Sequence, residues 1–355
     1  MRPRTSLDLP LALALALALL LSRAPGALGG LLYALVDSAQ ADVPSYVALI
    51  SPPNATLRQT AAITPPRNLF AAENLFALGS GRAAYILFGN LSTQVMDVLA
   101  FDLVSGAQLS QVPTPLPLMG IEGLQQEMAF IPATGEVVLL GAISTEADAP
   151  FFVLAVDPSS GAVRHVTKEG ISPKDYQGFL GNFAGFSPPS NRFWFQLRNS
   201  SNEQVMVSFH VDVTTGEIAT VNGCFFNSAA YDAARDEFVG FAVFRNGTNI
   251  TDVYEAIASV PANATQDCKI GAKIFDEGRG QLATIAGELL AFDAELRLVY
   301  TYALRQDLTT YSLIEVNSET GKLQVLEPPL ESVADLPAFI AVSALCSERG
   351  GEGAC

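Results

Sequence analysis

Six polar residues recur at one position of a repeated pattern, where their side chains could share protons or bind a cation. Each lies four residues before an aromatic residue, except in the first copy, where Ala72 occupies that position and a shift by one residue brings in Glu73. The polar residues are Glu73, Gln126, Asn182, Asn227, Glu288 and Asp335. The aromatic residues are Phe76, Phe130, Phe186, Tyr231, Phe292 and Phe339. If the copies form a circle, these polar side chains line its axis as a collar at the mouth of a central channel.

Three members of this collar are acidic, and this composition restricts the chemistry it supports. Carboxylates about 6 Å apart repel each other by roughly 3 kcal/mol at an effective dielectric constant of 20. Such a pair therefore favours a shared proton or a bound cation. Carboxylate and amide oxygens are ligands that suit Ca²⁺. The alternative is an ordinary polar channel without metal, because water can satisfy all six side chains.

A second repeated phrase marks the elements that would position the collar. It consists of an apolar run, Asp or Asn, two residues, Ser or Thr, and Gly. The copies are Asp102–Gly106, Asp157–Gly161, Asp212–Gly216 and Asn317–Gly321, and two degenerate copies place Ser51 and Val260 at the first position. In such a hairpin turn, the Asp or Asn side chain accepts a hydrogen bond from the backbone N–H two residues on, and Gly adopts a positive φ.

The two landmarks keep a common register along the chain. The distance from each aromatic residue to the next turn is 25 to 29 residues. Runs rich in β-branched and aromatic residues, such as RFWFQLR, lie between the landmarks and are typical of strands. Each unit therefore predicts a four-stranded antiparallel sheet. Repeated sheets without intervening helices predict an all-β protein, a β-propeller whose blades cover each other's faces.

The two ends of the chain complete each other. Phe339 is an aromatic landmark without a following turn, whereas the turn at Ser51 has no aromatic landmark before it. One blade would take its innermost strand from residues near 335–345 and its outer three strands from LLYALV, YVALIS and TLRQTAAI. We therefore predict a six-bladed propeller over residues 30–346, closed by N- and C-terminal strands that share one blade. Residues 347–355 would form a C-terminal tail.

The turn phrase is similar to that of quinoprotein-like and YVTN-type propellers, a resemblance to a superfamily that indicates no specific family. The order of Glu73, Asn182, Asn227 and Asp335 on successive units also resembles the calcium site of six-bladed lactonases of the gluconolactonase and paraoxonase type. This resemblance implies that these four residues bind Ca²⁺. The metal would then polarise an ester carbonyl or acidify a bound water.

The first 29 residues are typical of a secretory signal peptide. Two arginines precede an apolar run over residues 9–21, which is shorter than the roughly 20 residues that a membrane-spanning helix needs. Cleavage after Ala24, Gly26 or Gly29 fits the sequence equally well. Without residues 1–29 the chain keeps 17 basic and 35 acidic residues, a net charge of −18. Such a surface repels nucleic acid and anionic lipid, and we expect no membrane span in the mature chain.

Sequons and cysteines agree with an extracellular location. The six sequons begin at Asn54, Asn90, Asn199, Asn246, Asn249 and Asn263. The four cysteines, Cys224, Cys268, Cys346 and Cys355, allow three connectivities, of which we favour 224 with 268 and 346 with 355. The first bridge would close a loop of about 45 residues and stabilise the fold by roughly 4 kcal/mol.

Other catalytic arrangements find little support in the sequence. His165 and His210, the only histidines, fall on outer strands, where we expect surface or packed residues. No G-x-S-x-G, P-loop or H-E-x-x-H motif is present. Two loops of mixed composition, STEADAPF at 144–151 and EGISPKDYQGF at 169–179, are candidates for contacting a partner.

These observations predict a secreted, N-glycosylated propeller that acts as a monomeric binding module for an extracellular protein or glycan. One alternative is a calcium-dependent propeller hydrolase of lactonase or arylesterase type. A second alternative is a cell-surface or matrix component without a small ligand.

Overall fold

The computed structural model describes a set of segments that covers most of the chain. They are residues 32–38, 45–51, 56–63, 69–79, 83–102, 105, 107–117, 128–144, 146, 148–177, 184–202, 205–245, 253–274, 282–305, 311–326 and 340–347. In the terminal strands and in parts of the inner strands only the backbone is described. All regular elements of these segments are strands, and no helix able to cross a membrane occurs among them.

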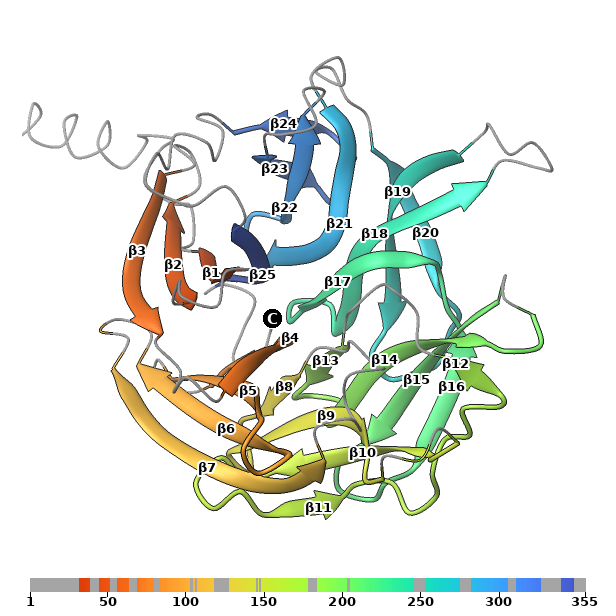
Figure 1. Cartoon of the computed structure of the whole chain (residues 1–355). Coiled ribbons are helices and arrows are strands. Elements are labelled where there is room, and N and C mark those ends of the chain that lie inside the picture. The colour runs from red at the N-terminus through yellow and green to blue at the C-terminus, as the bar shows by residue number, and fades with distance from the viewer. Residues whose placement is uncertain are drawn as a thin grey trace, which may run out of the picture.

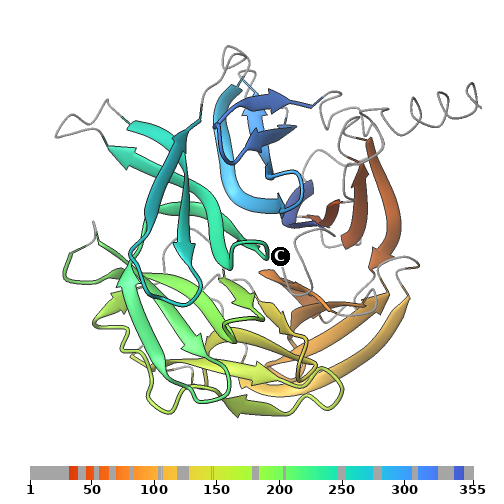
Figure 2. The ribbon, with the colours of Figure 1, turned by 180° about the vertical axis from the view of Figure 1, so that it is seen from behind.

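The strands of the described segments form six antiparallel sheets, here sheets I to VI, arranged around a common centre (Figures 1 and 2). Sheet I contains β25 (Ile340–Ser347), β1 (Leu32–Ser38), β2 (Ser45–Ser51) and β3 (Thr56–Ile63). Sheet II contains β4 (Leu69–Leu78), β5 (Ala83–Asn90), β6 (Val95–Asp102) and β7 (Gln108–Pro117). Sheet III contains β8 (Ala129–Ile131), β9 (Glu136–Ala142), β10 (Phe151–Val156) and β11 (Val163–His165).

The remaining three sheets complete the arrangement. Sheet IV contains β12 (Tyr176–Gln177), β13 (Ala184–Ser187), β14 (Arg192–Asn199), β15 (Met206–Asp212) and β16 (Ile218–Asn222). Sheet V contains β17 (Phe226–Asp232), β18 (Glu237–Arg245), β19 (Val253–Pro261) and β20 (Lys269–Lys273). Sheet VI contains β21 (Leu282–Asp293), β22 (Leu298–Arg305), β23 (Tyr311–Asn317) and β24 (Leu323–Val325). The all-β propeller architecture predicted from the repeats is confirmed.

The innermost strands contact one another in sequence around the centre. β4 contacts β8, β8 contacts β13, β13 contacts β17, β17 contacts β21, β21 contacts β25, and β25 contacts β4. β25 pairs with β1, so that Leu32 lies opposite Ser347 and Ser38 opposite Ile340. Strands from both ends of the chain therefore share sheet I, as the landmarks predicted. Phe339 lies outside the described residues.

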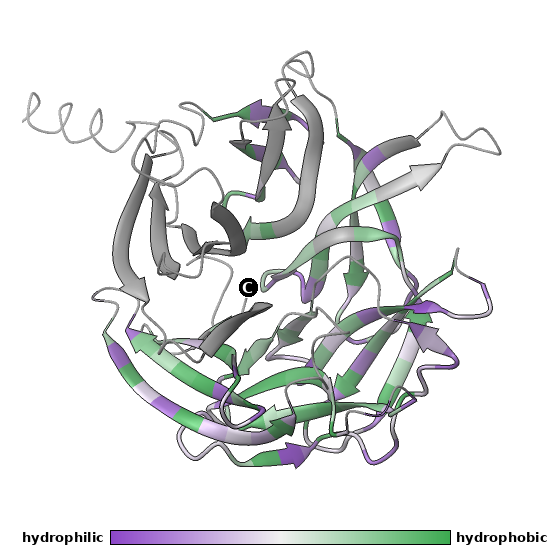
Figure 3. Ribbon diagram, in the orientation of Figure 1, coloured by the Kyte–Doolittle hydropathy of each residue, from purple (hydrophilic) through white to green (hydrophobic). Residues whose placement is uncertain are grey.

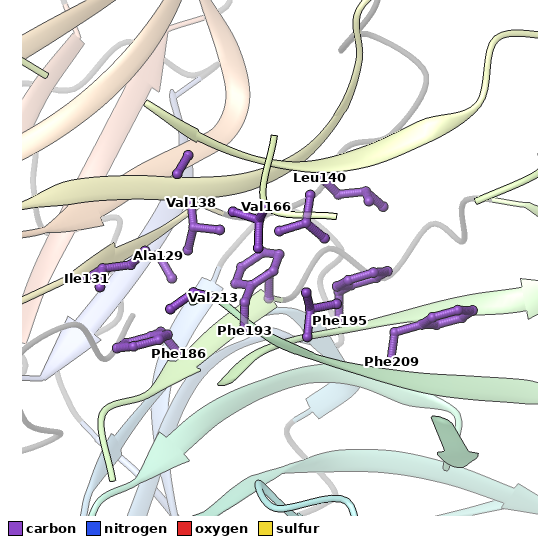
Figure 4. Close-up of a cluster of buried hydrophobic side chains, with 14 of the residues drawn as sticks. Ala129, Ile131, Val138, Leu140, Val166, Phe186, Phe193, Phe195, Phe209 and Val213 are labelled. Carbon is purple, nitrogen blue, oxygen red and sulfur yellow. The ribbon is translucent and has the colours of Figure 1, made fainter. Parts of the chain in front are cut away.

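Apolar side chains between neighbouring sheets form the core. Between sheets III and IV, Phe195 stacks on Phe209 with ring centroids 5.2 Å apart, and Phe186 and Phe193 are buried beside Val138 (Figure 4). Each such fully buried side chain contributes about 1.5–3 kcal/mol to stability. Figure 3 shows β5 and β6 hydrophobic over most of their length, whereas the outer β7 alternates with hydrophilic residues. Among the described side chains, the core therefore extends from sheet to sheet between sheets II and VI.

The hairpin turns have the predicted chemistry. In sheet III the backbone N–H of Ser159 donates to Asp157 Oδ1 at 2.8 Å, and the N–H of Gly161 donates to the Asp157 carbonyl at 2.8 Å. Gly161, Gly216 and Gly321 have φ values of +73°, +74° and +71°, in the left-handed region that glycine adopts readily. The equivalent glycine of sheet II, Gly106, lies outside the described residues.

Space as well as conformation requires glycine in these turns. A Cβ atom on Gly161, Gly216 or Gly321 would lie only 1.9–2.1 Å from a backbone carbonyl oxygen of the preceding sheet. The oxygens belong to Pro113, Val166 and Lys273, which lie on or just after the outermost strands β7, β11 and β20. Each turn is therefore pressed against the outer edge of the preceding sheet.

The junction between sheets IV and V is closed differently, because its turn lacks the glycine. Ala264 takes the positive φ, at 57°. The disulfide between Cys224 and Cys268, with Cα atoms 5.6 Å apart, links the end of sheet IV to the hairpin of sheet V. Beside it, the Asn222 N–H and side-chain amide donate to the Asp267 carboxylate, each at 3.0 Å. The predicted first disulfide is confirmed; the pairing of Cys346 with Cys355 stays a prediction, because residue 355 lies outside the described residues.

Sheet IV differs from the predicted four strands. The short β12 pairs with the end of β14, Tyr176 opposite Asn199 and Gln177 opposite Arg198. These residues belong to the loop predicted at 169–179. Their backbone pairs with the part of β14 that extends beyond the end of β13. No local sequence pattern marks so short a strand.

The turn contact predicts unequal effects of two glycine substitutions. Gly216→Ala and Gly135→Ala both place alanine at a positive φ, which costs about 1 kcal/mol. Only Gly216 faces a carbonyl oxygen, whereas nothing lies within 4 Å of the added Cβ at Gly135. We expect Gly216→Ala to reduce the free energy of unfolding by about 2 kcal/mol more than Gly135→Ala, measured by urea denaturation. Equal losses would contradict the proposed packing contact.

Candidate functional site

Three of the six predicted collar residues lie on described innermost strands. Glu73 is on β4, Asn227 on β17 and Glu288 on β21. The other three, Gln126, Asn182 and Asp335, lie outside the described residues, so the collar as a whole stays a prediction. The innermost strands contact one another around the centre, and the three backbone positions therefore belong to the inner circle of the molecule.

At each of these three positions the innermost strand departs from regular pairing with its neighbour. Between Ala71, opposite Phe88, and Phe76, opposite Ile86, four residues including Glu73 are left out of the ladder. Asn227 lies in a shift between Phe226 and Ser228. Glu288 lies in a shift between Ala286 and Leu290. Such bulges leave residues unpaired, redirect side chains and occur frequently next to active sites. The repeat pattern singled out these three residues, but it did not predict that the strands bulge at their positions.

Two loops predicted to contact a partner are joined into one structure, which we call the loop ridge (residues 148–151 and 169–177). The Phe151 N–H donates to the Ile171 carbonyl at 2.9 Å, and the Ile171 N–H donates to the Phe151 carbonyl at 2.7 Å. The Lys174 ammonium lies 3.3 Å from the Asp148 carboxylate, and both side chains are about three-quarters exposed. The two loops thus hold each other in place.

The loop ridge is also anchored to sheet IV. The Ser200 N–H donates to the Asp175 carbonyl at 2.9 Å. The Tyr176 ring packs edge-on against Phe209, with centroids 5.0 Å apart. Because antiparallel strands alternate in direction, the connection before β10 and the crossover before β13 lie at the same end of the sheets. The loop ridge therefore lies at the end where the chain enters the innermost strands.

The opposite end carries polar clusters that connect neighbouring sheets. Asp236 accepts hydrogen bonds from the hydroxyls of Tyr231, at 2.8 Å, and of Ser187 and Ser190. Burial, together with Asp236, raises the pKa of Tyr231 far above its usual range. Arg297 pairs with the buried Asp232 across sheets V and VI. These groups satisfy one another, and they hold the turn ends of the sheets together.

Two further features do not add to the site. His165 is exposed on β11 and His210 is buried on β15, so neither lies on an innermost strand, as predicted. A shallow cleft of about 400 Å³ opens at the rim between sheets III and IV, lined by Lys168, Glu169, Thr215, Gly216, Glu217 and Ile218. Among the described side chains, no three His, Cys, Asp or Glu residues gather in a way that could hold a metal ion.

Three sequons lie within the described residues, and their geometry differs. Asn199 Oδ1 accepts from the Ser201 hydroxyl at 2.6 Å, and Asn263 Oδ1 accepts from the Thr265 hydroxyl at 2.7 Å. Asn90 is only 8% exposed, and its side-chain nitrogen donates to Asp97 at 3.2 Å. The other three, Asn54, Asn246 and Asn249, lie outside the described residues.

Comparison with known proteins finds similarity at the level of fold. No family model and no curated protein matches the sequence. A putative 6-phosphogluconolactonase from Bacteroides uniformis is 14% identical, with a TM-score of 0.47, over 88% of this chain and 99% of its own. The β-propeller domain of the Trilobed protease from Pyrococcus furiosus is 11% identical, with a TM-score of 0.42, over 75% and 73%. The periplasmic gluconolactonase of Pseudomonas aeruginosa is 12% identical, with a TM-score of 0.43, over 84% and 95%. These similarities assign no activity to this chain.

The sequon geometry predicts selective glycosylation of protein secreted from eukaryotic cells. We expect glycans on Asn199 and Asn263, which lie at surface turns, and none on Asn90, because a glycan there would force a buried side chain out of its contact with Asp97. Glycopeptide mass spectrometry measures the occupancy. Thr265→Ala should remove one glycan, whereas Ser92→Ala, which destroys the sequon at Asn90, should leave the mass of attached glycan unchanged. A glycan on Asn90 would contradict the prediction.

Proposed function

We propose that this protein is a secreted, N-glycosylated, closed six-bladed propeller that acts as a monomeric binding module for an extracellular protein or glycan. The cycle of contacts between innermost strands and the shared sheet I support the closed ring. The Cys224–Cys268 disulfide is compatible with an oxidising compartment. The observation that carries the proposed activity is the loop ridge.

The loop ridge has the properties of a preorganised contact surface. Its backbone is fixed by the Phe151–Ile171 pairing and by β12, so little conformational entropy would be lost on binding. Gly170 fits closely against Pro150 and Phe152, where a Cβ would lie 2.5 Å and 2.9 Å from their side chains. Exposed polar groups on a rigid scaffold are the usual carriers of recognition. The negative net charge of the chain, −16, disfavours nucleic acid as the partner.

Charge reversal on the loop ridge tests this function. Purified glycosylated protein is screened against a panel of extracellular proteins and a glycan array, and each binder is then titrated by surface plasmon resonance. We expect Asp148→Lys with Asp175→Lys to weaken binding at least about tenfold, corresponding to about 1.4 kcal/mol. Glu295→Lys, which reverses an exposed acidic residue in the turn between β21 and β22 of sheet VI, should leave the affinity unchanged. Equal affinity of both variants would contradict the role of the loop ridge.

The second candidate function is a calcium-dependent hydrolase acting on lactones or esters. The specific observation that favours it is the coincidence of Glu73 and Asn227 with bulges on innermost strands. A carboxylate and an amide oxygen are suitable donors for Ca²⁺. With Asn182 and Asp335 they would form the ligand set, and the metal would supply Lewis acidity toward a bound carbonyl. The protein would contribute the fixed positions of the ligands.

Calcium removal tests this second candidate. If the collar binds Ca²⁺, saturating calcium at about 100 times its dissociation constant should stabilise the folded protein by roughly 2.7 kcal/mol relative to protein with chelator. Calorimetric melting with and without chelator measures the effect, and Glu73→Gln with Asp335→Asn should abolish it. Glu217→Gln with Glu295→Gln serves as the matched control. An identical melting temperature with and without chelator in the wild-type protein would refute the candidate.

A further inference from the structure

His210 occupies the seam between sheets IV and V, which we define as the facing surfaces of β14–β15 and of β17–β19 with the turn after β19. The side chain is completely buried. Its Nδ1 lies 3.0 Å from the carbonyl oxygen of Ala262, in the turn that follows β19. Because a carbonyl only accepts, Nδ1 carries a proton, and Nε2 is the nitrogen that gains or loses one. Nε2 has no hydrogen-bond partner among the described residues.

The described surroundings of His210 are largely apolar and offer Nε2 no hydrogen-bond acceptor. Trp194, which pairs across the strands with His210, stacks on Phe238 with ring centroids 4.5 Å apart. Arg192 on β14 acts electrostatically on the ring and has the same sign as an imidazolium. Several carboxylates of the surrounding elements are engaged by other groups. Hydrogen bonds engage Asp212 with Thr214 and Thr215, Asp236 with Tyr231, Ser187 and Ser190, and Asp267 with Asn222. Ion pairs engage Asp232 with Arg297 and Glu237 with Arg235.

These contacts make the closed seam resist protonation. Burial lowers the pKa of His210 to about 4; the Ala262 carbonyl opposes this shift, and Arg192 adds to it. If the seam opens, water reaches the ring and its pKa returns to about 6.5. The open form therefore binds a proton more tightly than the closed form. As the pH falls from about 6.5 to about 4, the equilibrium constant for opening should rise roughly 80-fold, and over the full range from well above 6.5 to well below 4 it should rise roughly 300-fold.

We propose that the seam between sheets IV and V is an acid-sensitive latch, which opens as His210 gains its second ring proton at Nε2, because that nitrogen is buried without a hydrogen-bond partner among the described residues. The disulfide between Cys224 and Cys268 crosses the same junction and keeps the two sheets attached while the latch is open. Opening is therefore local and reversible. The latch is independent of the proposed binding and hydrolase functions, because it requires neither the loop ridge nor the collar.

The single tryptophan of the chain reports directly on the latch, because Trp194 is buried in the seam. We expect its emission to shift to the red and its quenching by acrylamide to increase between pH 6.5 and pH 4, while the far-ultraviolet circular dichroism of the sheets persists. His210→Gln can still donate a hydrogen bond toward Ala262 but does not titrate, and it should lose the acid response. His165→Gln, which removes the exposed histidine of β11, should retain it.

Two results would overturn the latch. One is an unchanged acid response in His210→Gln; the other is a loss of circular dichroism at the same pH as the change in Trp194 emission. A measurement on the wild-type protein covers the case in which His210→Gln fails to fold. With only two histidines in the chain, proton NMR resolves both rings. The His210 ring should stay neutral to near pH 4, and titration near 6.5, as in a free imidazole, would also refute the proposal.

Discussion

The contact between a left-handed turn residue and the outer edge of the preceding sheet is the constraint on which the rest of this structure depends. It recurs at Gly161, Gly216 and Gly321, each time against a backbone carbonyl rather than a side chain. A backbone contact cannot be relieved by a change of rotamer, so it fixes the distance between neighbouring sheets at their rims. Aromatic packing between sheets acts nearer the centre, as in the stacking of Tyr85 of sheet II on Phe130 of sheet III, with ring centroids 5.5 Å apart. The three junctions that carry the glycine contact therefore share the same relation between a turn and the outer edge of the preceding sheet.

The exception at sheets IV and V shows how this constraint can be replaced. Ala264 stands where the turns of sheets III, IV and VI have glycine, and a side chain there excludes the same close approach. The disulfide and the Asn222–Asp267 hydrogen bonds connect the rims instead. The polar His210 contact with Ala262 lies in the same junction, in place of purely apolar packing. The junction without the glycine contact is thus the one that carries both a covalent bond and a titratable group.

Features encoded within a few neighbouring residues could be predicted from the sequence, and features made by distant pairing could not. The turn phrase fixes its own hydrogen bonds, such as Ser159 to Asp157, and so reveals where hairpins lie. The bulges could not be predicted, because the number of residues between two landmarks does not show which of those residues pair with the neighbouring strand. Four residues are left out of the ladder around Glu73, three around Glu288 and one at Asn227, so the copies differ in a property that their sequence spacing does not reveal. The loop ridge depends on the pairing of Phe151 with Ile171, which no local pattern marks.

The two ends of the sheets have different physical roles, and this difference indicates which end is free to carry a binding surface. At the turn end, Asp236 and the Arg297–Asp232 pair connect adjacent sheets, so a substitution there acts first on packing. At the other end, the backbone of the loop ridge connects sheets III and IV, whereas its exposed side chains, such as Asp148 and Lys174, take no part in that backbone connection. Residues at that end can therefore change with little effect on the fold, which is the condition under which a surface acquires specificity. Asn199 lies beside Ser200, whose N–H contacts the loop ridge, so a glycan on Asn199 would cover its sheet IV side. A partner would then approach the loop ridge from the sheet III side, where the Asp148–Lys174 ion pair is exposed.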